Sequence, residues 1–209
     1  MKDNVEEGRI DNCVPWTRIP GSEHHRRPSL AASNVWSQAR LNLSIDAHAL
    51  YLVSRGAMKS GAFYVGESHD AKDVSVTVFV HHRGEDTLAH ARVCRLSREG
   101  GQMGVGLFVR RPIRCILFEY LLLLMQISSS LHMPWDALGN DLRFVIKVEL
   151  PSSHGSIRYI PSFHVDLPMF ALTMDDLSAF CFGDIALRSS NSPIKAEVLV
   201  LYCLAARGY

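Results

Sequence analysis

The expected fold is decided by Ile185-Ala-Leu-Arg-Ser-Ser-Asn-Ser-Pro-Ile-Lys-Ala-Glu-Val198, in which apolar and polar residues alternate on both sides of a polar break. Ile185 and Leu187 precede the Ser/Asn/Pro cluster, and Ile194 resumes the alternation after it. Alternation with a period of two is typical of a half-buried strand, and a Ser/Asn/Pro cluster is typical of a turn. The stretch therefore predicts two half-buried strands joined by a turn.

A weaker copy of this unit lies far upstream, at Leu52–Phe63. Both copies run from a leucine through a serine to a turn residue, Gly56 or Asn191. Each then reaches an apolar residue, Met58 or Ile194. The pair of copies indicates a repeat turn in a stack of strands.

Other parts of the chain carry the same alternation. In addition, two short β-type runs flank the glycine pair Gly100-Gly101, which indicates a hairpin or bulged loop. The alternating stretches are Leu41–Ile45, Val74–Val80, Phe144–Leu150 and Ser162–Leu167, and the two runs are Ala91–Leu96 and Val105–Val109. We therefore predict a mostly-β chain, built as a sandwich-like or β-solenoid-like stack of short strands. One exception is Thr173–Asp176, whose capping-box spacing predicts a short helical turn through Leu177 and Phe180.

The ends and the middle of the chain differ from this pattern. Residues 1–37 are polar and broken by prolines, which predicts a disordered or loosely docked N-terminal tail before a single mostly-β domain over residues 38–209. The segment 113–133 is a possible helical insertion, with an apolar helix expected around 115–127. Because a membrane span needs about 20 apolar residues, a buried helix is favoured over membrane attachment through 113–133.

Composition and charge narrow the function classes. The net charge of +1 provides no global field for nucleic acid. The N-terminus lacks the apolar stretch of a secretory signal, and the five cysteines form no Cys-x-x-Cys pair. These features predict a cytoplasmic protein with reduced, buried thiols.

Candidate chemistry is weak throughout the sequence. Gly101–Gly106 resembles a phosphate-binding loop, but a strand-like run follows it where a helix is needed, so a turn with close backbone packing is favoured. Adjacent His81 and His82, near Glu85 and Asp86, would point to opposite faces of a strand, which disfavours a metal site. We assign no catalytic residue, no metal ligand and no cofactor.

A group of carboxylates offers the main enzymatic alternative: Asp166, Asp175, Asp176 and Asp184. Such residues would suit a glycosidase-type acid and base pair. The favoured interpretation is that Asp175 and Asp176 cap a turn and that Asp184 starts a strand.

Three groups of residues together resemble a fungal family of unknown function, domain of unknown function seventy-three-thirty, which is abundant in mushroom-forming fungi. They are Val74–Val78 with Leu88–Cys94 and Gly104–Phe108, then Phe163–Phe170, and finally Leu187–Ile194, whose turn looks like that of adhesin-like β-solenoids. The resemblance covers roughly residues 41 to 204. It implies an all-β, repeat-built domain and no catalytic residues.

We therefore predict a non-enzymatic structural, adhesion-like or partner-binding module whose β surface binds a protein or glycan partner. A carbohydrate-acting hydrolase using Asp166 and Asp184 is one alternative, and a membrane-attached protein is another. The apolar run Val198–Ala206 would leave an unpaired strand edge, which predicts possible self-association.

Overall fold

The computed structural model describes residues 9–20, 35–56, 58, 60–82, 85–110, 142–152, 156–175, 177–190 and 192–196. Strands dominate these residues, so the prediction of a mostly-β fold is confirmed. The elements are β1 (Arg9–Val14), β2 (Thr17–Arg18), β3 (Val35–Leu43), β4 (Ala49–Gly56), β5 (Gly61–Ser68), β6 (Val74–His82), α1 (Glu85–Leu88), β7 (Ala91–Arg98), β8 (Gln102–Val109), β9 (Arg143–Pro151), β10 (Arg158–Ile160), β11 (Phe163–Asp166), β12 (Phe170–Met174), β13 (Phe180–Phe182), β14 (Ile185–Arg188) and β15 (Ile194–Ala196).

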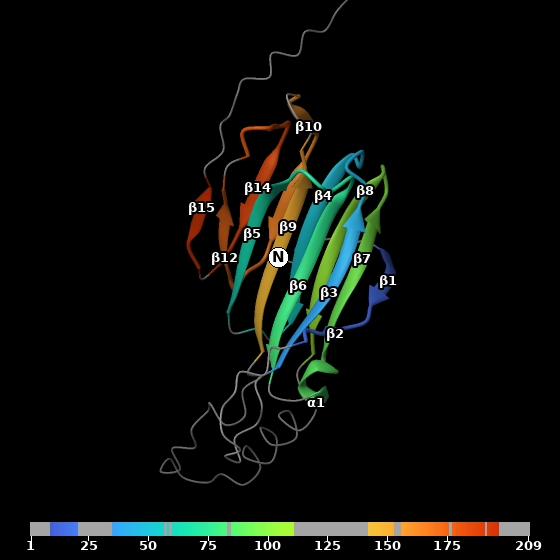
Figure 1. Cartoon of the computed structure of the whole chain (residues 1–209), viewed down its shortest axis with the longest axis vertical. Helices are drawn as coiled ribbons and strands as arrows, with labels where there is room; N and C mark the ends of the chain where they lie inside the picture. Colours follow the sequence, from blue (N-terminus) through green and yellow to red (C-terminus); the bar gives the residue numbers. More distant parts are fainter. Residues whose placement is uncertain are drawn as a thin grey trace, which may run out of the picture.

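Two mixed sheets make up the sandwich (Figure 1). One has the order β1-β7-β8-β4-β11-β14, and the other has the order β15-β12-β5-β9-β6-β3-β2. In both sheets the strands at one side pair antiparallel, as β1 with β7 and β3 with β6 do. At the other side they pair parallel, as β4 with β11 and β5 with β12 do. The two predicted architectures therefore coexist, since an antiparallel sandwich continues into parallel solenoid-like coils.

The parallel half repeats every 22 residues. Arg158 pairs with Phe180, Phe163 with Ile185, and Leu172 with Ile194, so each strand of one coil meets the residue 22 positions further along the chain. β10 and β13 form a small third face of these coils.

The predicted repeat relates the first coil, which contains β4 and β5, to the last described coil, which contains β14 and β15. The strand register confirms this repeat. Leu52 and Leu187 both pair with Val165, one from each side of β11. Ile194, however, shares its level with Leu172 and Phe63, and Met58 lies outside the strands. The two copies are therefore equivalent coils whose turns differ in length.

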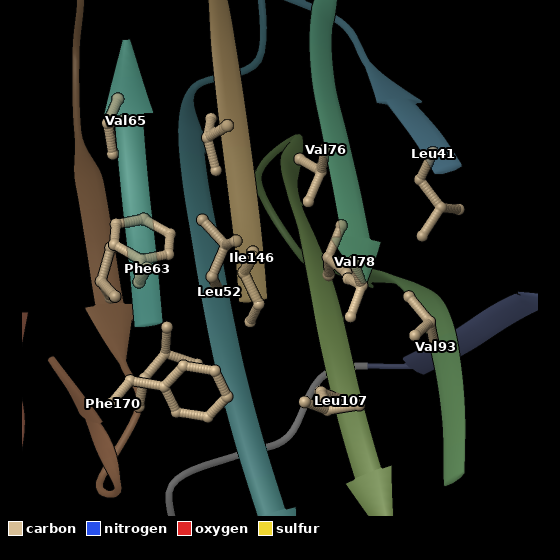
Figure 2. Packing of buried hydrophobic residues seen from close by; sticks show 14 of the residues in the cluster. Leu41, Leu52, Phe63, Val65, Val76, Val78, Val93, Leu107, Ile146 and Phe170 are labelled. Carbon is tan, nitrogen blue, oxygen red and sulfur yellow. The ribbon is translucent and has the colours of Figure 1, made fainter. Parts of the chain in front are cut away.

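The core lies between the two sheets and is filled from both (Figure 2). The valines of β6 share its inward face, as predicted, and β9 places Phe144, Ile146, Val148 and Leu150 in the same core. β-branched and aromatic side chains pack well on a pleated surface that is buried on one side. The alternation in these strands therefore sets which side faces the core.

The predicted hairpin is also confirmed, because β7 pairs antiparallel with β8 around Gly100 and Gly101. Both glycines have positive φ, of 77° and 74°. Gly104 and Gly106 then lie within β8, where an added Cβ would approach the ring carbons of Tyr51 or Phe108 to 2.6 Å or less. The interpretation of Gly101–Gly106 as a turn with close packing therefore holds.

Two predictions are wrong. Over the described residues 173–175 and 177–180 the capping-box helix is absent, because Thr173 and Met174 end strand β12 and Phe180 begins strand β13. The N-terminal tail is not loose over Arg9–Val14, which is an edge strand paired with β7. Polar edge strands lack the apolar alternation on which the prediction relied.

Other predictions fall on residues outside the described ranges. They are the possible helical insertion at 113–133, the helix around 115–127 and the apolar run Val198–Ala206. Within the described part of the chain, no helix has the length and apolar character required to cross a bilayer.

Gly61 in β5 provides a test of the coil packing. An added Cβ there would lie 2.3–2.7 Å from ring carbons of Phe170, which is fully buried on the neighbouring strand. We expect Gly61→Ala to lower the free energy of unfolding by about 2 kcal/mol, which is typical of an overpacked core. Urea denaturation would measure the change.

Gly66 on the same strand is the matched control, because an added Cβ there meets nothing within 4 Å. Gly66→Ala is expected to be neutral or slightly stabilising. Adding Phe170→Leu to Gly61→Ala should recover part of the lost stability relative to the sum of the two single changes. Equal effects of the two glycine substitutions would contradict the packing argument.

Candidate ligand-binding pocket

A pocket of about 830 Å³ is lined by residues of β1, β2, α1 and the strands beside them. Figure 1 shows β2 and α1 toward one end of the sandwich. Its walls combine apolar side chains with a small number of polar and charged groups. The lining residues are Cys13, Val14, Pro15, Trp16, Arg18, Val35, Ser37, His82, Glu85, Leu88, Ala89, Ala91 and Arg92. This volume and mixture are typical of small-molecule sites in proteins.

Two buried polar side chains face this pocket and hydrogen-bond to each other. Ser37 Oγ and His82 Nε2 lie 2.9 Å apart. Ser37 is 3% exposed and His82 is 2% exposed. A hydroxyl and an imidazole hold both donor and acceptor capacity, so the pair offers directional recognition at the end of an otherwise apolar interior.

The alternation of two strands places this pair. β6 directs Val74, Val76, Val78 and Val80 inward, and the next inward position is His82. β3 runs antiparallel to β6, with Val35 opposite His82 and Ser37 opposite Val80. Ser37 and His82 are therefore diagonal neighbours on one face, which is within reach of a histidine ring. His81 points outward instead, where it contacts the Trp36 ring at 5.1 Å between centroids.

The outer wall of the pocket belongs to the edge strand β1 and the residues after it. Trp16 packs partly buried against the core, and its indole Nε1 donates a hydrogen bond of 2.8 Å to the Ala91 carbonyl. A disulfide joins Cys13 to Cys94 directly across β1 and β7. The wall is therefore held by one disulfide and one partly buried indole hydrogen bond in addition to the strand pairing.

This disulfide corrects the prediction of reduced thiols. Cys13 and Cys94 are bonded to each other, and Cys181 is disulfide-bonded as well. The prediction treated apolar neighbours as evidence for free buried cysteines. It missed the bond because residues 81 positions apart become partners only through the pairing of β1 with β7.

Charged residues line the more exposed part of the pocket. Arg18, Arg92 and Glu85 are exposed, in contrast to the buried Ser37 and His82. The two guanidinium groups outnumber the single carboxylate, so the rim favours a ligand with negative charge. Guanidinium groups bind carboxylates and similar anions through paired hydrogen bonds.

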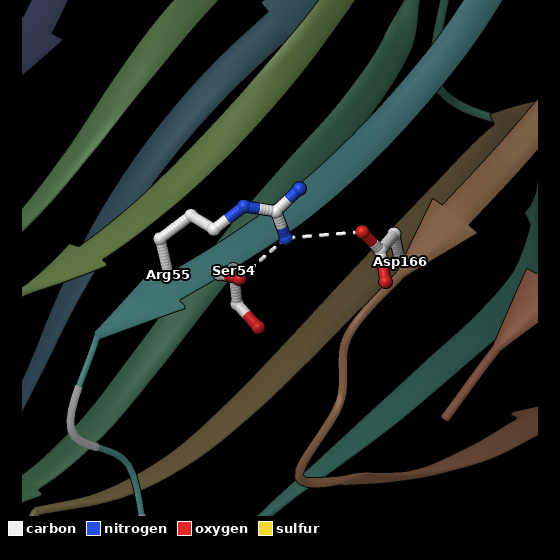
Figure 3. A network of polar contacts seen from close by, with 3 residues as sticks. All are labelled: Ser54, Arg55 and Asp166. Carbon is white, nitrogen blue, oxygen red and sulfur yellow. Dashed lines mark hydrogen bonds and ion pairs between the residues drawn. The ribbon is translucent and has the colours of Figure 1, made fainter. Parts of the chain in front are cut away.

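The carboxylates proposed for a hydrolase do not form a pair. Asp166 is ion-paired with Arg55, whose Nη1 lies 3.0 Å from Asp166 Oδ2 and also donates to the Ser54 carbonyl (Figure 3). Asp184 Oδ2 lies 2.6 Å from His164 Nε2.

Register also separates these two carboxylates. Phe163 pairs with Ile185, so Asp184 stands opposite Ser162, four positions before Asp166. Four extended residues span about 13 Å, whereas glycosidase carboxylates are roughly 5–10 Å apart. Each carboxylate is also held by a different basic partner, so the geometry does not assemble an acid and base pair.

The remaining candidates lie elsewhere. Asp175 is exposed after β12, and Asp176 is outside the described residues. Glu85 lines the pocket, whereas the adjacent Asp86 is not among its lining residues. Within the described ranges, no group of three or more His, Cys, Asp or Glu side chains is arranged to hold a metal ion.

Sequence reasoning missed Ser37 altogether, because it lies in the stretch interpreted as a tail. A signal for His82 was present, since it continues the inward row of β6 by one more position. No comparable signal marked Ser37, whose partner is 45 residues away in the sequence.

No protein-family model, curated protein or solved structure matches this chain.

Proposed function

We propose that this chain is a non-enzymatic binding module, and that the pocket beside β1 and α1 receives a ligand with an apolar body and an acidic group. The buried Ser37–His82 pair facing the pocket of about 830 Å³ carries this proposal. Buried polar groups are costly unless they are hydrogen-bonded. The hydrogen bond between Ser37 and His82 offsets this cost, and because both residues line the pocket, the pair is placed to meet a polar group of a ligand.

The pocket lining supports the ligand chemistry. Trp16, Leu88 and Val35 supply apolar surface, whereas Arg18 and Arg92 lie at the exposed part. An aromatic or aliphatic body would lie against the apolar wall, and its acidic group would face the guanidinium groups. The partner could present this chemistry as a free small molecule or as a group on a larger protein or glycan.

Blocking the pocket from its rim provides the test. Ala89 is exposed, lines the pocket and follows α1, so Ala89→Trp would fill the space without disturbing the core. We expect the native chain to bind the aromatic sulfonate dye 1-anilinonaphthalene-8-sulfonate, which has the required apolar body and anionic group. The Ala89→Trp variant is expected to lose at least about tenfold in affinity, equivalent to about 1.4 kcal/mol. Fluorescence titration would measure it.

Asp86→Trp is the matched control, because Asp86 is exposed in the same helical turn and does not line the pocket. This variant should bind the dye as the native chain does. Native-like binding by Ala89→Trp, with an unchanged unfolding transition, would refute the pocket as the site.

A hydrolase that uses Ser37 is a second candidate, favoured by the hydrogen bond between Ser37 Oγ and His82 Nε2. A serine hydroxyl hydrogen-bonded to a histidine nitrogen is the arrangement of an activated nucleophile and its base. This candidate requires covalent labelling of Ser37 by a fluorophosphonate and its loss in Ser37→Ala. Dye binding without labelling would leave the binding module as the better account.

Cellular location is a separate proposal. A cytoplasmic location is the proposal carried over from the sequence, whereas disulfides persist chiefly in oxidising compartments. The Cys13–Cys94 bond therefore supports a competing proposal, in which the chain works in an oxidising compartment.

A further inference from the structure

A second, smaller cavity lies on the outward face of the six-stranded sheet, away from the pocket beside β1 and α1. Its volume is about 190 Å³, and its walls come from β4, β7, β11 and β14. The side chains that matter are Tyr51, Arg98, His164, Asp166 and Arg188. None of these residues lines the first pocket.

Strand register brings these groups together. His164 on β11 pairs with Tyr51 on one side and with Ala186 on the other. Two residues further along β11, Asp166 pairs with Arg188 on β14. Successive outward positions of three parallel strands therefore line the cavity, and the side chains stack along the coils.

A glycine allows Arg98 to reach this site. Gly104 on β8 separates β7 from β4, and an added Cβ there would lie 2.6 Å from ring carbons of Tyr51. Because β8 has no side chain at this position, the Tyr51 ring leans over it. The Arg98 guanidinium lies 4.1 Å from the centre of that ring.

Hydrogen-bonding capacity is left over at the site. Tyr51 is 2% exposed, and its hydroxyl has no hydrogen-bond partner among the described groups. The same is true of Arg98 Nε. A buried polar atom without a hydrogen-bond partner is energetically costly, so these atoms favour a ligand that supplies one. Burial also raises the pKa of Tyr51 above its ordinary value, so its hydroxyl stays protonated and can donate.

The charge at the cavity is positive. Asp166 is ion-paired with Arg55, and the neighbouring carboxylate of Asp184 contacts His164, so Arg98 and Arg188 outnumber the one carboxylate without an arginine partner. Among the residues that the structure describes, neither Arg98 nor Arg188 is ion-paired with a carboxylate. Two guanidinium groups therefore remain available beside a small polar cavity.

We infer that this outward cavity binds an acidic sugar unit, with its carboxylate held by Arg98 beside Tyr51 and its hydroxyls facing His164, Asp166 and Arg188. Arginine recognises carboxylates through paired, charge-assisted hydrogen bonds. The sugar is preferred over a bare anion because His164 and Asp166 also line the cavity. Beside their contacts with Asp184 and Arg55, the second ring nitrogen and the second carboxylate oxygen can bind hydroxyl groups. This site is independent of the function proposed for the first pocket.

Titration of the full chain with glucuronate, monitored by isothermal calorimetry, tests the inference. We expect binding of glucuronate and no binding of glucose, which lacks the carboxylate. Arg98→Gln and Arg188→Gln should each weaken glucuronate binding by at least about tenfold, as expected for loss of a charge-assisted hydrogen bond. The exposed Arg143 lies on β9 of the other sheet, and Arg143→Gln removes the same charge without touching the cavity. That control should bind as the native chain does.

Three outcomes would overturn the inference. The first is absence of glucuronate binding by a chain that unfolds cooperatively. The second is equal binding of inorganic sulfate and glucuronate, which would indicate a site for small anions without sugar recognition. The third is an equal loss in Arg143→Gln, which would indicate non-specific attraction. Because Arg188 is exposed, its substitution tests the site even if Arg98→Gln fails to fold.

Discussion

Gly56→Ala is expected to lower the free energy of unfolding by roughly 3–5 kcal/mol, among the largest effects of any single methyl group in this chain. Gly56 ends β4 with φ of +107°. This conformation is rare for residues with a side chain. An alanine there would also place its Cβ 1.8 Å from the Val109 carbonyl oxygen on β8.

The size of this effect follows from what the methyl group meets. A side chain in the way can rotate to another rotamer, but Val109 contributes backbone atoms, including its carbonyl carbon at 2.8 Å. Relief would require β4 and β8 to separate at their paired ends, where Gly56 stands opposite Val109. The pairing of these strands joins the antiparallel and parallel halves of the sheet, so the cost would extend beyond one residue.

Urea denaturation of Gly56→Ala and Gly100→Ala separates the two causes. Gly100 also has positive φ, of 77°, but an added Cβ there meets nothing within 4 Å. Gly100→Ala should therefore cost only about 1 kcal/mol, the strain of the backbone conformation alone. If both variants lose the same stability, the proposed contact with Val109 contributes nothing.

Removal of the Cys13–Cys94 disulfide is expected to have the second large effect. The bond closes a loop of 81 residues in the unfolded chain, and the chain-entropy model assigns such a loop roughly 4 kcal/mol of stabilisation. We expect Cys13→Ala/Cys94→Ala to lower the free energy of unfolding by about 2–4 kcal/mol. Amide hydrogen exchange should also become faster in β1, which pairs with β7 and ends the sheet among the described strands.

Ser97→Ala is the control for this experiment. Ser97 Oγ donates a hydrogen bond of 2.9 Å to Asp11 Oδ1, which is a non-covalent tie between the same two strands. Since this hydrogen bond is exposed, its loss should lower the free energy of unfolding by at most about 0.5 kcal/mol. Unchanged exchange in β1 after removal of the disulfide would show that pairing and Trp16 alone hold the wall of the pocket.

Much of the fold follows from local pattern. The inward valines of β6 and the inward row of β9 were predictable because alternation fixes which side of a half-buried strand faces the core. The β7–β8 hairpin was predictable because its two glycines mark the turn. The repeat was visible because Leu52–Phe63 and the unit around Leu187 both run from leucine through serine to a turn residue. In the structure, Leu52 and Leu187 lie at the same level of the coils.

The sites could not be predicted in the same way. Ser37 and His82 meet only because β3 pairs with β6 in one particular register. Arg98 reaches Tyr51 only across Gly104 of an intervening strand. Cys13 lies in a polar edge strand without apolar alternation, so its bond to Cys94 left no local signal. Pairing between distant strands is a property of the whole chain, and short windows of sequence do not contain it.

The parallel half has a consequence for how the chain reaches its folded state. β4 and β5 belong to the first coil, but the strands that cover them, β11 and β12, follow only after β6 to β10. During synthesis from the N-terminus, about a hundred residues are added after β4 and β5 before their partners β11 and β12 are made. One edge of β4 and one edge of β5 stay unpaired during that time. Pairings of such long sequence separation form slowly, and exposed strand edges recruit other chains. The two coils formed by β10 to β15 therefore pair late with the edges of β4 and β5. Until then, those edges can pair with strands of other chains and lead to aggregation.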